Sequence, residues 1–240
     1  MKDTSEFKGF DFIGKNDQGF KEYRHKQSDM IFVLIPAGAF IMGVNDGRHF
    51  KDTNPIHPVK IGRFLMAKYQ VTQGVWLKIM NNNPSEFTKS DKHPVERVSW
   101  ESCQEFCQKT GLQLPTEAEW EYAYRAGTVT QYYWGDIKNK DYMWYQENST
   151  ESTQPVGQKT PNNFGLYDMA GNIWEWCQDW YGEYPYTEQT NPVGPSQGEL
   201  RVMRGGCWFS FSYNCRAANR FGAKPGKIMN LNGFRCAATV

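Results

Sequence analysis

The sequence contains no apolar run near the roughly 20 residues that a membrane-spanning helix needs. Lysine and arginine number 27 against 26 aspartates and glutamates, so a net charge of +1 gives no reason to expect binding to nucleic acid or to a membrane surface. Residues 1–10 contain no apolar core of a signal peptide. We therefore expect either a cytoplasmic protein or one whose leader has been removed.

Histidine and cysteine are too scattered to form a recognisable catalytic or metal cluster. His25 and His49 lie in polar segments, whereas His57 and His93 each precede a proline. No serine–histidine–aspartate arrangement can be assigned. The six cysteines include no Cys-x-x-Cys pair, so a zinc cage is not expected. Most of the cysteines are expected to be small buried apolar residues.

Aromatic residues, in contrast, make up 15% of a chain whose mean hydropathy is −0.71. This combination is typical of a loop-rich fold held together by aromatic clusters rather than by long aliphatic helices. A chain of 240 residues is long enough for one large domain with an ample core. We predict a polar, at best partly ordered N-terminal arm over residues 1–30 and a single domain over residues 31–240.

Weak alternation of apolar and polar residues predicts strands over residues 30–41, 59–69, 199–208 and 234–239. Three short helices are predicted to begin at the N-cap residues Thr72, Ser99 and Thr116.

The third helix carries three glutamates near its start. Thr116 and Glu119 have the spacing of a capping box. Glu117, Glu119 and Glu121 could be taken for catalytic carboxylates. The better interpretation is that all three glutamates are acids favoured by capping and by the helix dipole.

The segment over residues 162–180 concentrates large apolar side chains around the turn at residues 170–172. A plain loop would not hold so many apolar residues, and a helix would not hold that turn. We predict buried irregular structure, with Asp168 and Glu175 flanking the turn. Buried backbone must find hydrogen-bond partners, and a bound cation is one way to satisfy inward-pointing carbonyls beside two carboxylates.

Within this segment, GLYDMAGNIWEW (165–176) resembles the signature of the formylglycine-generating-enzyme, or sulfatase-modifying factor, superfamily. The resemblance covers roughly residues 32–238. It implies an α+β, irregular C-type-lectin-like fold with little regular secondary structure, but it does not fix the activity, because one fold hosts many functions. Six further segments agree with it in order, over residues 35–43, 69–76, 93–107, 112–127, 201–208 and 232–237.

The resemblance also implies a structural calcium ion, because family members hold one in the loop that matches this segment. Carried over by position, the ligands are the side chains of Asp168 and Glu175 and the carbonyl oxygens of Gly171 and Ile173. Oxygen ligands with two carboxylates suit a hard divalent cation. The alternative is that the two carboxylates only accept backbone hydrogen bonds or pair with arginine.

Formylglycine-generating enzymes are copper-dependent oxidases that use two cysteines five positions apart, just after a Gly-Gly turn. Soft thiolates suit Cu(I). Aligning that turn with residues 205–206 places Ser210 and Cys215 at the two positions, while Cys207 and Cys215 are eight apart. The cysteine pair is therefore absent, and no copper is expected. A copper-dependent oxidase, or another redox member of the superfamily, is the disfavoured alternative.

Residues 208–233 resemble the variable region of the target proteins of diversity-generating retroelements, which share this fold and end in a Gly-Phe-Arg motif, here at 233–235. In those proteins, template adenines, commonly in AAC codons, are replaced at random. Two runs, 209–214 and 221–223, mix aromatic and very small residues that NNC codons encode. The alternative is an ordinary superfamily member whose aromatic residues pack inside.

We therefore predict a non-catalytic protein that binds a ligand through residues 208–232. Aromatic and small polar residues together make an adaptable contact surface. The expected partner is a protein or a cell-surface ligand, which implies display at the cell surface or secretion. Arg216, Arg220 and Arg235 are expected to bond backbone carbonyls of the framework. The predicted contact residues are Phe209, Ser210, Phe211, Ser212, Tyr213, Asn214, Phe221, Gly222, Ala223, Ile228, Asn230, Leu231 and Asn232.

Overall fold

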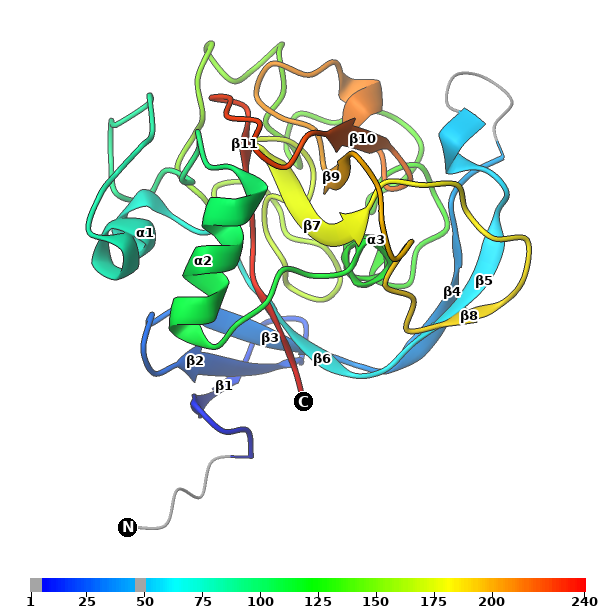
Figure 1. Cartoon of the computed structure of the whole chain (residues 1–240), viewed down its shortest axis with the longest axis horizontal. Coiled ribbons are helices and arrows are strands. Elements are labelled where there is room, and N and C mark those ends of the chain that lie inside the picture. The colour runs from blue at the N-terminus through cyan, green and yellow to red at the C-terminus, as the bar shows by residue number, and fades with distance from the viewer. Residues whose placement is uncertain (1–5, 46–50) are drawn as a thin grey trace.

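The computed structural model describes residues 6–45 and 51–240. In that part of the chain, three sheets and three short α-helices are joined by long irregular segments (Figure 1), as expected for the predicted α+β class. The helices are α1 (Gln73–Met80), α2 (Trp100–Thr110) and α3 (Glu117–Arg125), with 3-10 turns η1 (Lys51–Thr53) and η2 (Ser212–Cys215). The strands are β1 (Phe10–Lys15), β2 (Lys21–His25), β3 (Ile31–Ile35), β4 (Gly38–Met42), β5 (His57–Ile61), β6 (Phe64–Ala67), β7 (Trp174–Trp180), β8 (Gln189–Thr190), β9 (Arg201–Arg204), β10 (Arg220–Ala223), β11 (Asn232–Gly233) and β12 (Ala237–Thr239).

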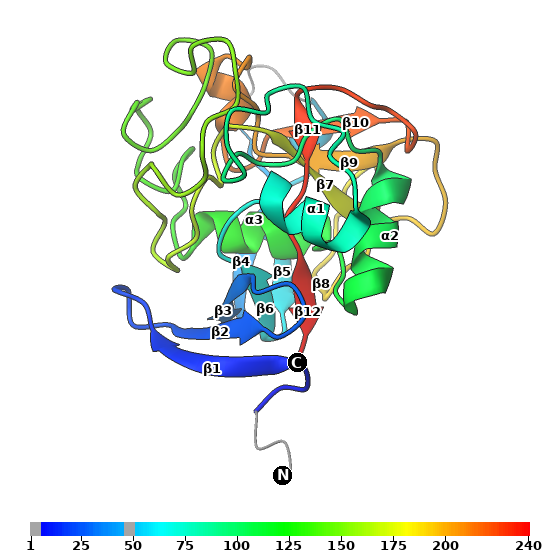
Figure 2. The same ribbon diagram turned by 90° about the vertical axis from the view of Figure 1, so that its left-hand side faces the viewer.

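The largest sheet has the strand order β1-β2-β3-β6-β12, and all of its neighbouring pairs are antiparallel. It lies at the lower end of the molecule in Figure 2 and brings the first and last strands of the described chain into one layer. Because β12 pairs with β6, the end of the chain is fixed against a central hairpin rather than left free.

Residues 6–30 are not the partly ordered arm that their polarity predicts, and that prediction is wrong for this segment. β1 pairs with β2, and β2 pairs with β3. The ring of Phe10 packs edge-on against Phe32 at 5.2 Å between centroids, and Tyr23 is fully buried. The sequence gives little sign of β1 because it is an edge strand and most of its side chains are exposed.

The two strands predicted over residues 30–41 and 59–69 are each divided in two. The breaks fall at residues 36–37 and 62–63, and the first break contains a proline, which removes a hydrogen-bond donor from the ladder. The halves β3 and β6 pair in the five-stranded sheet, whereas β4 and β5 pair in a second sheet that also contains β8. One bent hairpin therefore connects two sheets.

The third sheet, in the order β10-β9-β7-β11, contains the second half of the segment 162–180. Residues 162–173 form buried irregular structure as predicted. Residues 174–180 are instead the regular strand β7, so the prediction of irregular structure is wrong for them. The predicted strand over 199–208 is shortened to β9, and residues 205–208 turn away from the sheet.

All three helices begin where their caps predict. The side chains of Thr72, Ser99 and Thr116 each accept a hydrogen bond from a backbone N–H of the first turn. Both halves of the predicted capping box between Thr116 and Glu119 are present. None of the helices in the described residues is long and apolar enough to cross a membrane.

The interior consists of two apolar clusters rich in aromatic rings. In one, Trp76 stacks on Phe106 at 5.6 Å, and Phe106 meets Phe234 edge-on at 5.3 Å. In the other, Trp120 packs against Tyr124 at 5.3 Å. All six cysteines are buried and free, as expected for small apolar residues.

Candidate functional site

The candidate contact region begins at the turn that follows β9. Gly205 and Gly206 have φ angles of +95° and +76°, a region that favours glycine. A Cβ atom at Gly206 would lie 2.7 Å from the sulfur of Cys215, so the close approach of the two segments also requires glycine. The turn directs residues 207–215 away from the sheet toward the end of the molecule opposite β1–β3 (Figures 1 and 2).

Three aromatic side chains project from the segment that follows this turn. Phe209, Phe211 and Tyr213 are 57%, 56% and 45% exposed. The rings of Phe211 and Tyr213 stack at 5.5 Å, and Phe209 packs against Trp208 at 5.4 Å. The alternative in which these aromatics fill the core is therefore wrong for these three.

Two more of the predicted contact residues, Phe221 of β10 and Ile228, are large, apolar and exposed. Phe221 rests on Trp174 of β7 at 5.5 Å between centroids. A group of partly buried residues lies among the five exposed side chains and can contribute edges to a contact. This group consists of Ser212, Asn214, Gly222, Asn230 and Leu231.

Three predicted contact residues, Ser210, Ala223 and Asn232, are buried, so their side chains cannot form a contact surface. Ser210 Oγ accepts a hydrogen bond from the backbone N–H of Cys207 at 3.0 Å. Asn232 Nδ2 donates to the carbonyl of Val98 at 3.0 Å. Both polar residues hold the backbone beneath the exposed aromatics, and their sequence position alone does not reveal this role.

The framework beneath this region is held by buried arginine–glutamate pairs. Arg235 forms two bonds to Glu175, at 2.7 and 2.8 Å, and also donates to the carbonyls of Ala67 and Tyr167. The framework role predicted for this arginine agrees with these carbonyl bonds. The ion pair also matches the alternative in which Glu175 pairs with arginine.

Two glutamates of α3 do more than the predicted capping. Arg220 forms two bonds to Glu117, at 2.6 and 2.7 Å. Glu121 bonds to Arg125 at 2.8 Å and also pairs with Arg204. Both carboxylates are buried, and each pairs with at least one arginine from outside α3. The interpretation of these two acids through capping and the helix dipole alone therefore misses their buried ion pairs.

The third arginine that was expected to belong to the framework differs from the other two. Arg216 is partly exposed, and its Nε donates to the carbonyl of Tyr213 at 2.9 Å. This bond fixes the end of η2, directly beside the exposed aromatics.

The residues expected to bind calcium converge, but they converge on a side-chain amide. The Nε2 atom of Gln70 lies 2.9 Å from Glu175 Oε1. The same nitrogen lies 3.2, 3.3 and 3.5 Å from the carbonyl oxygens of Asp168, Gly171 and Ile173. We call these four oxygens the oxygen cage. Sequence reasoning missed Gln70, which is 98 to 105 residues from its acceptors.

The Asp168 side chain does not belong to this cage. Its Oδ2 accepts a hydrogen bond from the N–H of Gly157 at 2.7 Å, whereas Oδ1 is buried without a hydrogen-bond partner in the described part of the chain. Burial raises the pKa of this carboxyl to about 6. The backbone carbonyl, not the carboxylate, is therefore the atom that Asp168 contributes to the cage.

With Gln70 in place, the residues do not fit a calcium ion. Calcium takes six to eight oxygen ligands at about 2.3–2.6 Å. Here the centre of the cage holds a nitrogen donor, and the charge of Glu175 is already balanced by Arg235. The Oε1 atom of Gln70 faces away and accepts from Asn172 at 3.1 Å. Calcium binding therefore stays a prediction that requires Gln70 to leave.

The two cysteines after the Gly-Gly turn, Cys207 and Cys215, are eight positions apart, which is not the spacing of the copper ligands in the enzymes that this region resembles. The sulfur of Cys207 lies 3.2 Å from Ser210 Oγ. Burial raises the pKa of both thiols, Cys207 and Cys215, which disfavours the thiolate form that binds Cu(I). The described residues contain no group of three or more histidine, cysteine, aspartate or glutamate side chains that could hold a metal ion.

Comparison with known proteins gives the chain its family. A model of the sulfatase-modifying factor enzyme 1-like domain matches residues 18–240. The serine/threonine-protein kinase Pkn1 of Chlamydia caviae is 36% identical, with 87% of this chain and 38% of the kinase covered. The formylglycine-generating enzyme of Bos taurus is 33% identical, with 86% and 74% covered. The chain thus spans well under half of the kinase's length.

Two solved structures share the fold along most of this chain. Treponema denticola variable protein 1 has a TM-score of 0.80 at 30% identity, and the match covers 88% of this chain and 96% of that protein. PvdO from Pseudomonas aeruginosa has a TM-score of 0.80 at 25% identity, with 98% and 100% covered. These matches confirm the predicted C-type-lectin-like α+β fold. The chain belongs to the sulfatase-modifying factor enzyme 1-like family.

Proposed function

We propose that the protein binds a ligand without catalysis through an aromatic surface, which we define as Phe209, Phe211, Tyr213, Phe221 and Ile228. The observation that carries this proposal is their exposure, which is between 45% and 57% for five large apolar side chains that follow one buried turn. Exposed apolar side chains gathered in one region mark interaction sites, and aromatic rings supply rigid contact area.

The backbone under the aromatic surface is fixed independently of the exposed side chains. Trp208 Nε1 donates to the carbonyl of Asn230 at 2.9 Å, and Tyr124 Oη donates to the carbonyl of Cys215 at 2.7 Å. Both donors come from buried residues. Exchange of exposed side chains would leave these bonds in place, because surface substitutions usually change stability little.

The finer proposal is that residues 209–214 and 221–223 are diversified by a retroelement. Their resemblance to such variable regions supports it, and so does the 30% identity to Treponema denticola variable protein 1. The partner would be a protein or a cell-surface ligand, with the chain displayed at the cell surface or secreted. The buried Ser210 and Ala223 would then be fixed rather than variable positions.

The direct test is to sequence the DNA that flanks the 3′ end of the coding gene. We expect a near-repeat of the codons for residues 208–236 that differs at adenines and lies beside a reverse-transcriptase gene. Differences should fall on codons of exposed residues such as Phe209 and Tyr213, and codons of buried residues such as Asn232 should match the template. If the genome contained no such repeat, the proposal of diversification would be wrong, and the aromatic surface would have a fixed composition.

Relatives named formylglycine-generating enzyme make an oxidase the second candidate. Against it, a serine, Ser210, stands where the first cysteine of the pair is expected, and burial raises the pKa of the thiols of Cys207 and Cys215. The reduced protein should therefore bind Cu(I) weakly and leave a cysteine-containing peptide unchanged. Tight 1:1 Cu(I) binding together with oxidation of the peptide would overturn the non-catalytic proposal.

A further inference from the structure

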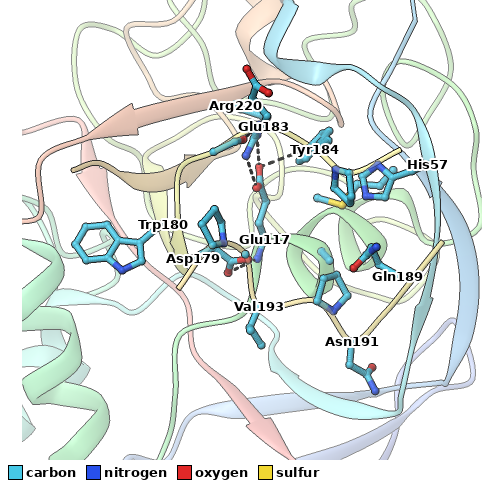
Figure 3. Close-up of a pocket in the computed structure, with 17 residues that line it drawn as sticks. His57, Glu117, Asp179, Trp180, Glu183, Tyr184, Gln189, Asn191, Val193 and Arg220 are labelled. Carbon is cyan, nitrogen blue, oxygen red and sulfur yellow. Dashed lines mark hydrogen bonds and ion pairs between the residues drawn. The ribbon is translucent and has the colours of Figure 1, made fainter. Parts of the chain in front are cut away.

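A cavity of about 440 Å³ lies away from the aromatic surface, where the start of α3, the end of β7 and the loop over residues 182–195 meet (Figure 3). Its volume is within the range of about 300–1,000 Å³ that is typical of small-molecule sites. Figure 3 shows Glu117 and Asp179 in the middle of the view, with His57 and Gln189 across from them. We call it the Asp179 pocket.

The acids that line the Asp179 pocket differ in their partners, because Glu117 also lies 3.4 Å from Arg204. Glu117 is neutralised by Arg220, whose Nε and Nη2 both donate to it. The remaining nitrogen of Arg220 donates to the carbonyls of Asp52 and Gly182. Neither Asp179 nor Glu183, which also line the pocket, forms an ion pair with any residue in 6–45 or 51–240. Asp179 and Glu183 are therefore the acids of the pocket that have no lysine or arginine partner within 4 Å among the described residues.

Asp179 is the buried member of this pair of acids, only 4% exposed. Its Oδ2 accepts a hydrogen bond from the backbone N–H of Glu117 at 2.8 Å, which orients the carboxyl group. Its Oδ1 receives no hydrogen bond from the described residues. Gly194 lies against this oxygen, and a Cβ atom there would be 3.0 Å from it. Because Asp179 lines the pocket, this oxygen is the acceptor that the residue can offer to a ligand.

The other walls suit a small molecule with one polar end. Met42 and Ala118 give an apolar lining. The ring of His57 packs against Tyr184 at 5.0 Å, so ring carbon atoms line the same wall. An alkyl chain can contact these walls while a positively charged end donates to Asp179.

We infer that the Asp179 pocket binds a small primary alkylammonium ion, whose ammonium group donates to Asp179 Oδ1. This site shares no residue with the aromatic surface, so it would be a second binding function of the chain. A buried carboxylate pairs favourably with a cation because an unpaired buried charge is costly. At pH 8 and above, where the carboxyl group is ionised, neutral hydrogen-bond donors of the same size should bind more weakly, since they leave that charge unpaired.

Proton linkage gives the site a pH signature. Burial and the neighbouring charge of Glu117 raise the pKa of Asp179 to about 8. The other groups that face it are Glu119 of α3, Arg220 of β10 and Arg201 of β9. Below pH 8, binding of the ammonium ion must release the Asp179 proton. The affinity should therefore rise by up to about tenfold per pH unit from pH 6 toward pH 8, and then level off.

The test uses n-butylammonium chloride, with 1-butanol as the neutral probe of equal chain length, and measures binding to the full chain by calorimetry. We expect saturable binding of butylammonium that strengthens from pH 6 to pH 8, and binding of butanol at least about tenfold weaker. Both expectations concern the unmodified protein, so they do not depend on whether a variant folds. Equal binding of the two probes, or no butylammonium binding at pH 8, would overturn the inference.

Two variants locate the site. Asp179→Asn keeps an acceptor for the N–H of Glu117 but removes the titratable charge, so the affinity at pH 8 should fall by about tenfold or more and lose its pH dependence. Glu183→Gln removes one exposed charge of the same pocket and should change the affinity by less than about threefold. If Asp179→Asn bound butylammonium as the unmodified protein does, Asp179 would not be the acceptor.

Discussion

Gln70 serves as a cross-link between segments far apart in the chain. Its Nε2 has two hydrogens and faces four oxygens, from three backbone carbonyls and Glu175. A divalent cation would satisfy the same oxygens, so the amide and the ion are alternatives at one place. We expect the melting temperature of the unmodified protein to be the same in EDTA and in millimolar calcium, within about 1 °C.

The variant Gln70→Glu reverses this expectation. It places a second carboxylate beside Glu175, so the protein should melt lower in EDTA and recover when calcium is added. Gln70→Ala is the control, because it opens the cage without adding a carboxylate and should recover less than Gln70→Glu when calcium is added. A saturable calcium shift in the unmodified protein, measured by differential scanning calorimetry, would show instead that the ion displaces Gln70.

The pair of Arg235 and Glu175 makes a prediction about stability. Arg235→Met leaves Glu175 buried without its counter-charge, which should lower the free energy of unfolding by about 3–5 kcal/mol in urea titrations. Lys78→Met is the matched control, because Lys78 pairs with Asp29 at the surface. It should cost no more than about 1 kcal/mol. Equal effects of the two substitutions would contradict a structural role for the buried pair.

At the scale of elements, β1 and β2 protect the edge of β3. Deletion of residues 1–28 would expose the N–H and C=O groups of β3 and remove Phe10 and Tyr23 from the core. We expect the truncated protein to melt lower and to aggregate, as measured by light scattering during a thermal ramp. Deletion of residues 1–5 alone, which stops before β1, is the control. A truncated chain that stays monomeric with an unchanged melting temperature would restore the arm interpretation.

Local chemistry explains which elements could be predicted. The caps at Thr72, Ser99 and Thr116 lie within three residues of the groups that they bond, so the sequence shows them directly. The division of residues 30–41 between two sheets depends on pairing with residues 57–67, which no local pattern reports. The motifs that indicated the candidate contact region are local in the same way, but burial of Ser210 and Asn232 depends on distant partners.

At the scale of the whole molecule, the exposed side chains of the aromatic surface should be replaceable with little change in the free energy of unfolding. A triple variant with serine at positions 209, 211 and 213 should unfold within about 1 kcal/mol of the unmodified protein, because these side chains are about half exposed. Trp208→Ser, one residue before them, removes a buried ring and its bond to Asn230. It should cost about 3 kcal/mol or more.

Guanidinium titrations of the triple variant and of Trp208→Ser would measure the free energy of unfolding of each. If the triple variant were as unstable as Trp208→Ser, the exposed aromatic side chains would be needed to stabilise the fold. The proposal that they can be exchanged on a fixed backbone would then be wrong. If only the triple variant kept its stability, any loss of ligand capture by it could be assigned to the contact surface itself.

The buried free thiols make the chain its own probe of internal motion. A thiol reagent attacks a cysteine only after the surrounding structure opens, so the labelling rate at each site measures the free energy of that opening. Two of the cysteines lie in the cluster around Trp120, and four lie in the cluster around Phe106. Mass spectrometry of labelled peptides would therefore tell whether the two halves of the interior open together or separately, without the addition of any foreign label. The six reporters are Cys103, Cys107, Cys177, Cys207, Cys215 and Cys236.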